Sequence, residues 1–342
     1  MTSRRAALQL AGSALVTAAL GAPQAVAQRG DLAPGPTKID VKAEPLSGFA
    51  TRDSARKRFG ALEFRGGLVL TSDAKDFGGI SSIRVERDGK RFLAVTDKGR
   101  WLRGRIDYQG DKPSGIADVE IAPILGADGK PMPRRYYDSE SLAESGGTVW
   151  VGYERVHQIF RFDYGKQGLL ARGQPVRMPP ETKKMPSNKG IEGLVAVPPG
   201  LPLAGTLIAL SEKALDENGN ILGYLIGGKS PGSFAIKRIG EFDITDAALT
   251  PAGDLLILER AFSFLRGAGM RIRRVSLSAV QPGALLDGPV LIEADWSFNI
   301  DNMECLSVHA GDKGETVLTI VSDDNFSSWQ RTLLLQFTLI EP

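Results

Sequence analysis

The segment VSDDNF, residues 321–326, places three oxygen-bearing side chains directly after an apolar run. A strand is predicted over residues 317–321, and Asp323, Asp324 and Asn325 follow it. A tight turn accounts for one or two such residues at a strand end. Three in a row also suit a hard cation such as Ca²⁺, which binds about six to eight oxygen ligands. Two interpretations therefore stand for this segment, a turn and a metal or substrate site.

The segment belongs to a repeat that predicts the fold. Five stretches share one layout, in which a small or acidic residue precedes an apolar strand, a turn, a second apolar strand and an acid. They lie at 77–99, 138–155, 188–213, 243–260 and 301–325, and two further strand-like runs follow each of the first four. Four strands in about 55 residues, without a clear helix, indicate an all-β protein, a β-propeller of four-stranded antiparallel blades. A β-sandwich does not predict such a repeat.

Five blades are predicted, and six would require additional strands within residues 28–76. The last unit has only one strand-like run after VSDDNF, at 331–340. The missing outer strand is expected to come from residues 61–71, which would close the ring by joining the two ends of the chain in one blade.

The propeller geometry predicts that many acids lie at one mouth of the channel. The first strand of each blade starts at this face and the second strand returns to it. The expected members before the first strands are Gly79, Glu140, Glu192, Asp246 and Glu304, and those after the second strands are Asp97, Glu154, Glu212, Glu259 and Asp323. Two carboxylates 4 Å apart repel by about 1 kcal/mol in water and about 4 kcal/mol near a protein surface. This ring therefore needs counter-charges or protons.

Bases follow four of these acids directly. They are Lys98, Arg155, Lys213 and Arg260, while in the fifth blade the nearest base is Arg331. Because neighbours on a strand point to opposite faces, each base is expected to meet an acid of the next blade. The ring can therefore act as a set of salt bridges between blades, as a site for a metal or an anionic substrate, or as both.

The N-terminal residues predict export. Arg4 and Arg5, an Ala/Leu-rich run and the small residues at 25–27 are typical of a twin-arginine signal peptide over residues 1–27. Its removal takes away two arginines and no acid, which lowers the net charge from +2 to zero and disfavours nucleic acid as a partner. We expect residues 28–58 to be a linker or leading arm with little structure. The mature protein is expected in the periplasm or outside the cell, after contact with the twin-arginine export machinery and without a stable membrane anchor.

Several stretches resemble a known family. FGGISSI, GIEGLVAV, LLILER and VSDDNFSSWQRTLLLQF are similar to landmarks of the phytase-like propeller family described as having esterase-like activity. The resemblance covers about residues 59–340 and sets the expected domain at 59–342. It implies an exported bacterial β-propeller that hydrolyses esters. Related phytases are calcium-dependent phosphomonoesterases, with Ca²⁺ held by carboxylates at the channel mouth and phosphate held by lysines and arginines.

These observations lead to a site hypothesis. The first function expected is metal-assisted hydrolysis of an ester, including a phosphomonoester, and the alternative is a non-catalytic periplasmic propeller that binds a ligand or a protein. The catalytic residues expected are Glu192, Glu304 and Asp323. The expected calcium ligands are Glu140, Glu192, Asp246, Glu304, Asp323 and Asp324. Substrate binding is expected from Arg155, Lys213, Arg260, Arg331 and His157.

Overall fold

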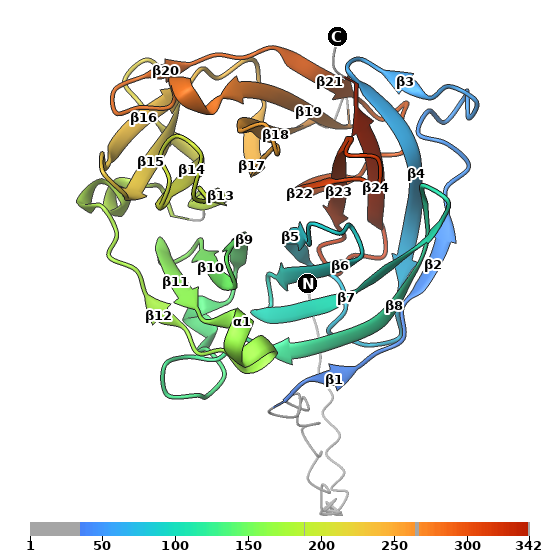
Figure 1. Cartoon of the computed structure of the whole chain (residues 1–342), viewed down its shortest axis with the longest axis horizontal. Helices are drawn as coiled ribbons and strands as arrows, with labels where there is room; N and C mark the ends of the chain where they lie inside the picture. The colour runs from blue at the N-terminus through green and yellow to red at the C-terminus, as the bar shows by residue number, and fades with distance from the viewer. Residues whose placement is uncertain (1–34, 188, 264–266, 341–342) are drawn as a thin grey trace, which may run out of the picture. The chain divides into compact units, whose positions relative to one another are not determined.

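The computed structural model describes residues 35–187, 189–263 and 267–340, and these form five small sheets arranged in a ring (Figure 1). The prediction of a five-bladed β-propeller is thereby confirmed. The predicted signal peptide, residues 1–27, lies outside the described residues. In the part of the chain that the structure describes, no helix is both long and apolar enough to cross a membrane.

The blades follow one another along the chain, and in each the first strand is innermost. From the centre to the rim, blade one contains β5 (Ile80–Val85), β6 (Arg91–Thr96), β7 (Arg100–Gln109) and β8 (Lys112–Pro123). Blade two contains β9 (Ser139–Ser145), β10 (Thr148–Tyr153), β11 (Gln158–Phe162) and β12 (Gln174–Pro175). Blade three contains β13 (Ile191–Ala196), β14 (Thr206–Leu215), β15 (Ile221–Gly227), β16 (Gly232–Ile236) and β20 (Leu285–Leu286).

Blades four and five complete the ring. Blade four contains β17 (Asp243–Leu249), β18 (Asp254–Ser263), β19 (Gly267–Ser276) and β21 (Val290–Ala294). Blade five contains β22 (Asn302–Ala310), β23 (Thr316–Asp323), β24 (Thr332–Leu339) and β4 (Leu62–Thr71), with β3 (Arg58–Phe59) also paired to β4. Short helices occupy connections only: α1 (Tyr164–Gln167) and 3₁₀ turns at Arg134–Tyr136, Gly168–Leu170, Pro180–Lys184 and Leu277–Ala279.

The ring is closed as the sequence predicts. Strand β4, from the start of the fold, pairs antiparallel with β24 at its end, and Figure 1 shows the two strands side by side. The expectation of little structure in residues 28–58 is wrong for two short stretches. Strand β1 (Thr37–Lys38) pairs with β8, and β2 (Lys42–Pro45) pairs with β4. Ile39, Val41 and Ala43 pack against the core between blades five and one, which explains why strands form in this part of the arm.

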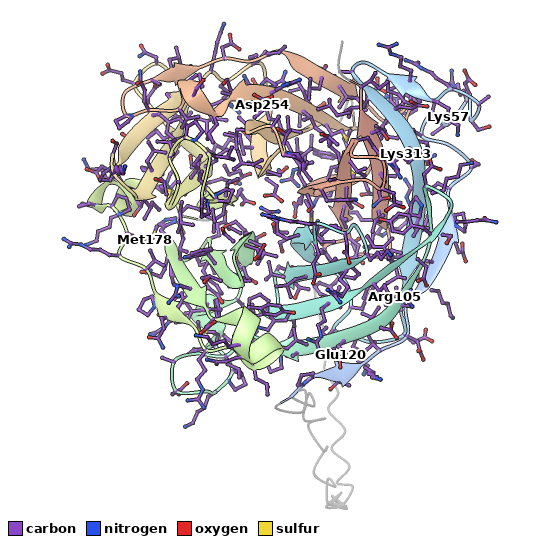
Figure 2. The ribbon with its side chains drawn as sticks, viewed as in Figure 1. Lys57, Arg105, Glu120, Met178, Asp254 and Lys313 are labelled. Atoms are coloured by element: carbon purple, nitrogen blue, oxygen red, sulfur yellow. The ribbon has the colours of Figure 1, made fainter. Side chains whose placement is uncertain are left out.

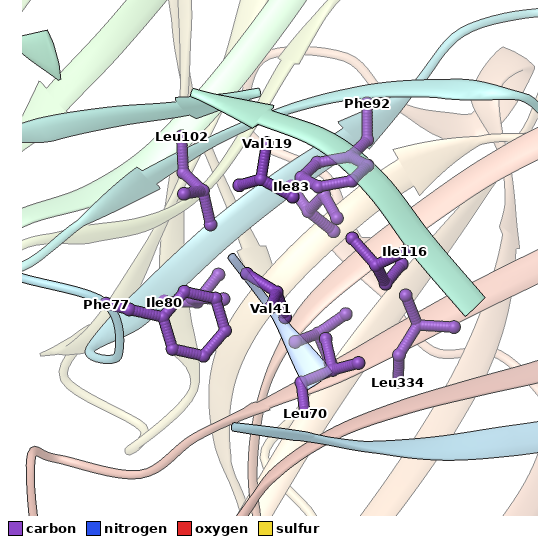
Figure 3. A pocket seen from close by; sticks show the side chains of 11 residues that line it. Val41, Leu70, Phe77, Ile80, Ile83, Phe92, Leu102, Ile116, Val119 and Leu334 are labelled. Carbon is purple, nitrogen blue, oxygen red and sulfur yellow. The ribbon is translucent and has the colours of Figure 1, made fainter. Parts of the chain in front are cut away.

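Apolar side chains fill the space between neighbouring sheets (Figure 2), because most strands are buried on both faces. A small gap lies between blades five and one, with a volume of about 10 Å³, and Figure 3 shows its apolar lining, which includes Leu70, Ile83 and Leu334. A buried water needs about this much room and also polar partners. The gap is therefore a dry packing defect rather than a binding site.

Arg84 ties the inner strands together. Its guanidinium donates hydrogen bonds to the carbonyl oxygens of Leu194 (2.9 Å), Ala247 (3.2 Å) and Leu306 (2.9 Å), which belong to three other blades. It also forms an ion pair with the buried Asp246 at 3.0 Å. One side chain thus bridges four of the five inner strands, and it does so deeper in the ring than the acidic mouth.

Replacing Arg84 with Met should lower the free energy of unfolding by about 3–5 kcal/mol, because it leaves the Asp246 carboxylate buried without its partner. Guanidinium chloride denaturation measures this change. The control is Arg105→Met, which removes an exposed pair with Asp118 at 3.1 Å and should leave the stability almost unchanged, because solvent screens the pair. A loss no larger than that of the control would show that Arg84 does not hold the ring together.

Candidate metal and substrate site at the channel mouth

Every inner strand carries a β-bulge at the same depth. In each blade the register between the first and second strands skips one residue of the first strand. A bulge of this kind re-aims a side chain and often lies near a functional site. The skipped residues are Ser81, Glu140, Glu192, Thr245 and Glu304.

The second strands supply a matching position at the mouth. In each second strand, one residue pairs with the first-strand residue just before the bulge, and the mouth position is the residue that comes next along the chain. From blade one to blade five these positions are Asp97, Glu154, Glu212, Arg260 and Asp323. In three blades the backbone N–H at this position donates to a carbonyl oxygen two residues before the bulge. These bonds are Asp97 to Gly79 (3.0 Å), Glu154 to Asp138 (3.1 Å) and Glu212 to Gly190 (2.9 Å).

Three predicted mouth positions are wrong by one or two residues. In blade four the bulge is Thr245, so Asp246 lies one residue deeper, where it accepts bonds from Arg84 and from the Leu306 N–H (2.9 Å). Glu259 pairs directly with Ile244 and is buried inside the blade against Arg271 and Arg273, which leaves Arg260 at the mouth. Blade one presents Ser81 rather than Gly79. Side chains alternate with a period of two, so a one-residue shift in register moves a side chain to the other face.

Carboxylates of blades two and three meet in two overlapping triples. One oxygen of each of Asp138, Glu140 and Glu154 lies within 4.8 Å of the others, and the same holds for Glu154, Glu192 and Glu212. Glu154 belongs to both triples. The spacing of the repeat predicts Glu140 and Glu192 at this place but not Asp138. The sequence contains a signal for Asp138. An Asp or Asn stands two residues before the acid at the bulge in both DSE (138–140) and NME (302–304).

Burial raises the pKa of three carboxyl groups in the triples, Glu140, Glu154 and Glu192. It is the largest cause for Glu140 and Glu192, whose pKa values are well above the usual range, and the charges of neighbouring carboxylates add to it. Burial likewise raises the pKa of Glu154 to about 6 and that of Asp97 to about 7. The Oδ1 atom of Asp97 is buried and has no hydrogen-bond partner among the described residues.

Glu304 and Asp323 extend the cluster into blade five. Burial is the main cause of the raised pKa of both carboxyl groups. For Asp323, the negative charge of Glu304 is the second largest cause. Arg260 lies beside them, 2.9 Å from Glu304, and it also bonds to Asn302. Lys189 makes the corresponding contact with Glu212 at 2.7 Å. Within the described part of the chain, the carboxylates of the mouth nevertheless outnumber the cations that contact them.

The structure separates the predicted substrate-binding residues. Arg260 lies among the carboxylates, and Arg155 is at their edge, where it pairs with Asp138 at 2.5 Å. Lys213 pairs with Asp243 at 2.7 Å and Arg331 with Asp301 at 3.6 Å, so both are engaged elsewhere. The expectation that bases meet an acid of the next blade is confirmed for Lys213 and Arg260. It is wrong for Arg155, because Asp138 lies across the sheet within the same blade.

Among the described residues, no hydrogen bond or ion pair joins the His157 side chain to these carboxylates, although its backbone N–H donates to the carbonyl oxygen of Glu154 at 3.2 Å. Its Nδ1 atom is buried without a hydrogen-bond partner among the described residues, and burial lowers its pKa.

Both aspartates of VSDDNF take part in the turn, but only Asp323 also belongs to the carboxylate cluster. Asp323 is 4% exposed, and its Oδ1 accepts the N–H of Asn325 at 2.7 Å. Asp324 holds the turn, because its oxygens accept bonds from the N–H groups of Gly79 (2.9 Å) and Phe326 (3.0 Å) and from the hydroxyl of Thr332 (3.0 Å). Gly79 is required there. Its φ is +58°, and a Cβ atom would lie 2.2 Å from the Asp97 carboxylate.

The carboxylate triples suit a calcium ion. Ca²⁺ binds oxygen at about 2.3–2.6 Å, so two oxygens of one ion are at most about 5 Å apart. The oxygens of each triple all lie within 4.8 Å of one another, which meets this limit. The unpartnered oxygen of Asp97 and the excess of buried carboxylates also fit a site that holds positive charge.

The fold and this mouth define a five-bladed propeller with an acidic channel entrance. The chain belongs to the phytase-like family described by the esterase-like activity of phytase, whose model matches residues 75–326. A comparison with curated proteins found no match.

Similar solved structures include a glutaminyl cyclase from Myxococcus xanthus, with 10% identity over 77% of this chain and 92% of that chain and a TM-score of 0.41. U3-55K has 10% identity over 80% and 98%, with a TM-score of 0.39. A glucose dehydrogenase-like oxidoreductase from Thermus thermophilus has 15% identity over 86% and 100%, with a TM-score of 0.34. Similarity at this level gives no information on activity.

Proposed function

We propose that this protein is an exported ester hydrolase that works with calcium at the channel mouth and accepts phosphate monoesters as one class of ester. The observation that carries the proposal is the pair of carboxylate triples that share the buried Glu154, one of them wholly buried and the other half-buried. Buried carboxylates in excess of their cations are costly unless they take up protons or bind a metal. Membership of the phytase-like family supports the same chemistry.

The side chains at the mouth have distinct roles in this proposal. Asp138, Glu140, Glu154, Glu192 and Glu212 hold calcium, which when bound neutralises negative charge on the substrate and activates water. Arg260 is held in place by Glu304 and presents a cation to an anionic group of the substrate.

The mouth also contains a side chain that can accept a proton. Asp97, with a pKa of about 7 and an unpartnered oxygen, can accept a proton near neutral pH. The expected catalytic residues Glu192, Glu304 and Asp323 remain part of the proposal, the first as a calcium ligand and the other two beside Arg260.

Export forms part of the proposal and rests on the N-terminal sequence. Arg4, Arg5 and the Ala/Leu-rich run that follows support passage through the twin-arginine machinery to the periplasm or the medium.

A hydrolysis assay tests the proposed activity. The mature protein should hydrolyse 4-nitrophenyl acetate or 4-nitrophenyl phosphate in the presence of calcium, and a chelator should remove the activity until calcium is added back. Persistent hydrolysis in chelator would contradict a role for calcium. No hydrolysis of either ester, together with calcium-dependent stability, would favour the second candidate, a propeller that only binds its ligand at this mouth.

A further inference from the structure

A groove crosses the mouth-side end of blade four, next to the carboxylate cluster. Its cavity volume is about 1000 Å³. Strand β18 leads from the mouth into it, because Ala261, which lines the groove, directly follows Arg260. The other walls are the segment 239–242, which precedes β17, and the segment 293–298, which follows β21.

Aromatic side chains dominate this groove. Phe242, Phe262, Trp296 and Phe298 all line it. Phe262 and Trp296 are 68% and 69% exposed, which is unusual for side chains of this size in a protein whose other aromatic residues are mostly packed. Exposed aromatic residues that gather at a concave surface mark a binding site, since rings stack well with other planar apolar groups.

Small residues leave room between the rings. A Cβ atom added to Gly269 would lie 3.6 Å from the ring of Phe242 and 3.7 Å from the carbonyl oxygen of Ala294. Both neighbours line the groove, so a larger side chain at Gly269 would occupy it. Arg271 supports the Phe242 ring from 4.1 Å, and its charge is matched by Glu259 at 2.7 Å. The arginine is therefore a fixed part of the wall rather than a free cation.

Charge limits what the groove can accept. Three acids line it, namely Glu241, Glu293 and Asp295, and of these Glu293 lies 3.9 Å from Arg271. Because the cation of the wall is already paired, an anionic ligand would meet net negative charge from the described residues that line the groove. An uncharged aromatic ring meets no such penalty.

We propose that this groove binds the aromatic ring of an ester substrate while the ester group lies at the carboxylate cluster. The inference rests on the proposed function for the position of the ester group, but the binding of the ring is independent of it. The preferred substrates are then esters with an uncharged aromatic part, rather than small aliphatic esters.

A binding experiment tests the groove without any catalysis. Isothermal titration calorimetry of the mature protein with 2-naphthol should give saturable binding. Both Gly269→Leu, which fills the groove, and Trp296→Ala, which removes a ring, should weaken it by about tenfold. The matched control is Gly115→Leu in blade one, whose Cβ would meet only Asp107 at 3.6 Å, and it should bind as the wild type does.

Two results of this titration would overturn the proposal. One is no binding of 2-naphthol to the wild type, and the other is equal binding by a folded Gly269→Leu variant. Binding to phosphatidylcholine vesicles that depends on Trp296, without binding of 2-naphthol, would assign the exposed rings to a lipid surface instead.

A kinetic comparison then places the ring relative to the reaction. Gly269→Leu should lower kcat/KM for 2-naphthyl acetate by about tenfold and leave kcat/KM for methyl acetate nearly unchanged. An equal loss for both esters would contradict a role in specificity. If the wild type hydrolyses neither of these acetates nor 4-nitrophenyl phosphate, the proposed hydrolase function fails, while the titration with 2-naphthol still decides whether the groove binds a ring.

Discussion

Calcium should raise the melting temperature of the metal-free protein by about 5 °C when it is present at about 100 times its dissociation constant. The increase should be larger at about pH 8.5 than at about pH 6.5. Burial raises the pKa of Glu154 to about 6 and of Asp97 to about 7, well above the values these groups have in the unfolded chain. Each group therefore contributes stability while it is protonated, and this contribution is lost as the pH rises through its pKa in the folded protein.

The metal-free protein should consequently melt at lower temperature as the pH rises over this range. The charge of bound calcium replaces the lost protons, so calcium should restore most of the loss. His309 opposes this trend only slightly. Burial lowers its pKa to about 4 in the folded protein, so only the unfolded chain releases a proton from it, near the lower end of this range. Differential scanning calorimetry at several pH values, with chelator and with calcium, measures both effects.

Two adjacent aspartates provide the control for this prediction. Asp323→Asn alters the carboxylate cluster and should reduce the calcium-dependent increase. Asp324→Asn alters a turn, so it should lower the melting temperature both with and without calcium. The rise in melting temperature that calcium causes should stay the same. A metal-free protein whose stability rises between these pH values would show that the cluster is not held protonated. The absence of any response to calcium would remove the metal from the mechanism.

Glu154→Gln should reduce calcium-dependent hydrolysis by about 100-fold or more, the largest loss expected of any single carboxylate. Glu154 is the one residue common to both triples, so its replacement removes a negatively charged ligand from each. The change preserves the shape of the side chain and relieves the cost of a buried charge, so the variant should fold and melt at the same or a higher temperature without calcium. Steady-state kinetics over a range of calcium concentrations measures the loss.

Glu144→Gln is the matched control. Glu144 lies in the same blade and the same strand as Glu140, but it is exposed and caps a turn by accepting the N–H of Gly147 at 2.9 Å. This variant should keep the activity of the wild type. Activity retained by Glu154→Gln at every calcium concentration would place the reaction away from the two triples.

The number of blades and the closure of the ring followed from local signals. Each repeat unit contains its own strands and turns, so apolar runs in the sequence reveal the blades one by one. The last unit lacked an outer strand, and a free strand at the start of the fold had to fill that place because an open edge is unfavourable. The acids Glu140, Glu192, Glu304 and Asp323 were found in the same way, since their units share one spacing.

Tertiary structure decided which side chains reach the mouth. In blade four the bulge lies at Thr245, so a hydroxyl takes the mouth position predicted for Asp246. The same register brings Arg260, rather than Glu259, to the surface of the channel. Apolar periodicity does not show where a register skips a residue, because the skip depends on pairing with the neighbouring strand. The contact of Arg84 with three other blades likewise depends on strands that are far apart in the chain. Spacing in the sequence therefore indicated an acidic mouth, whereas the pairing of strands selected its members.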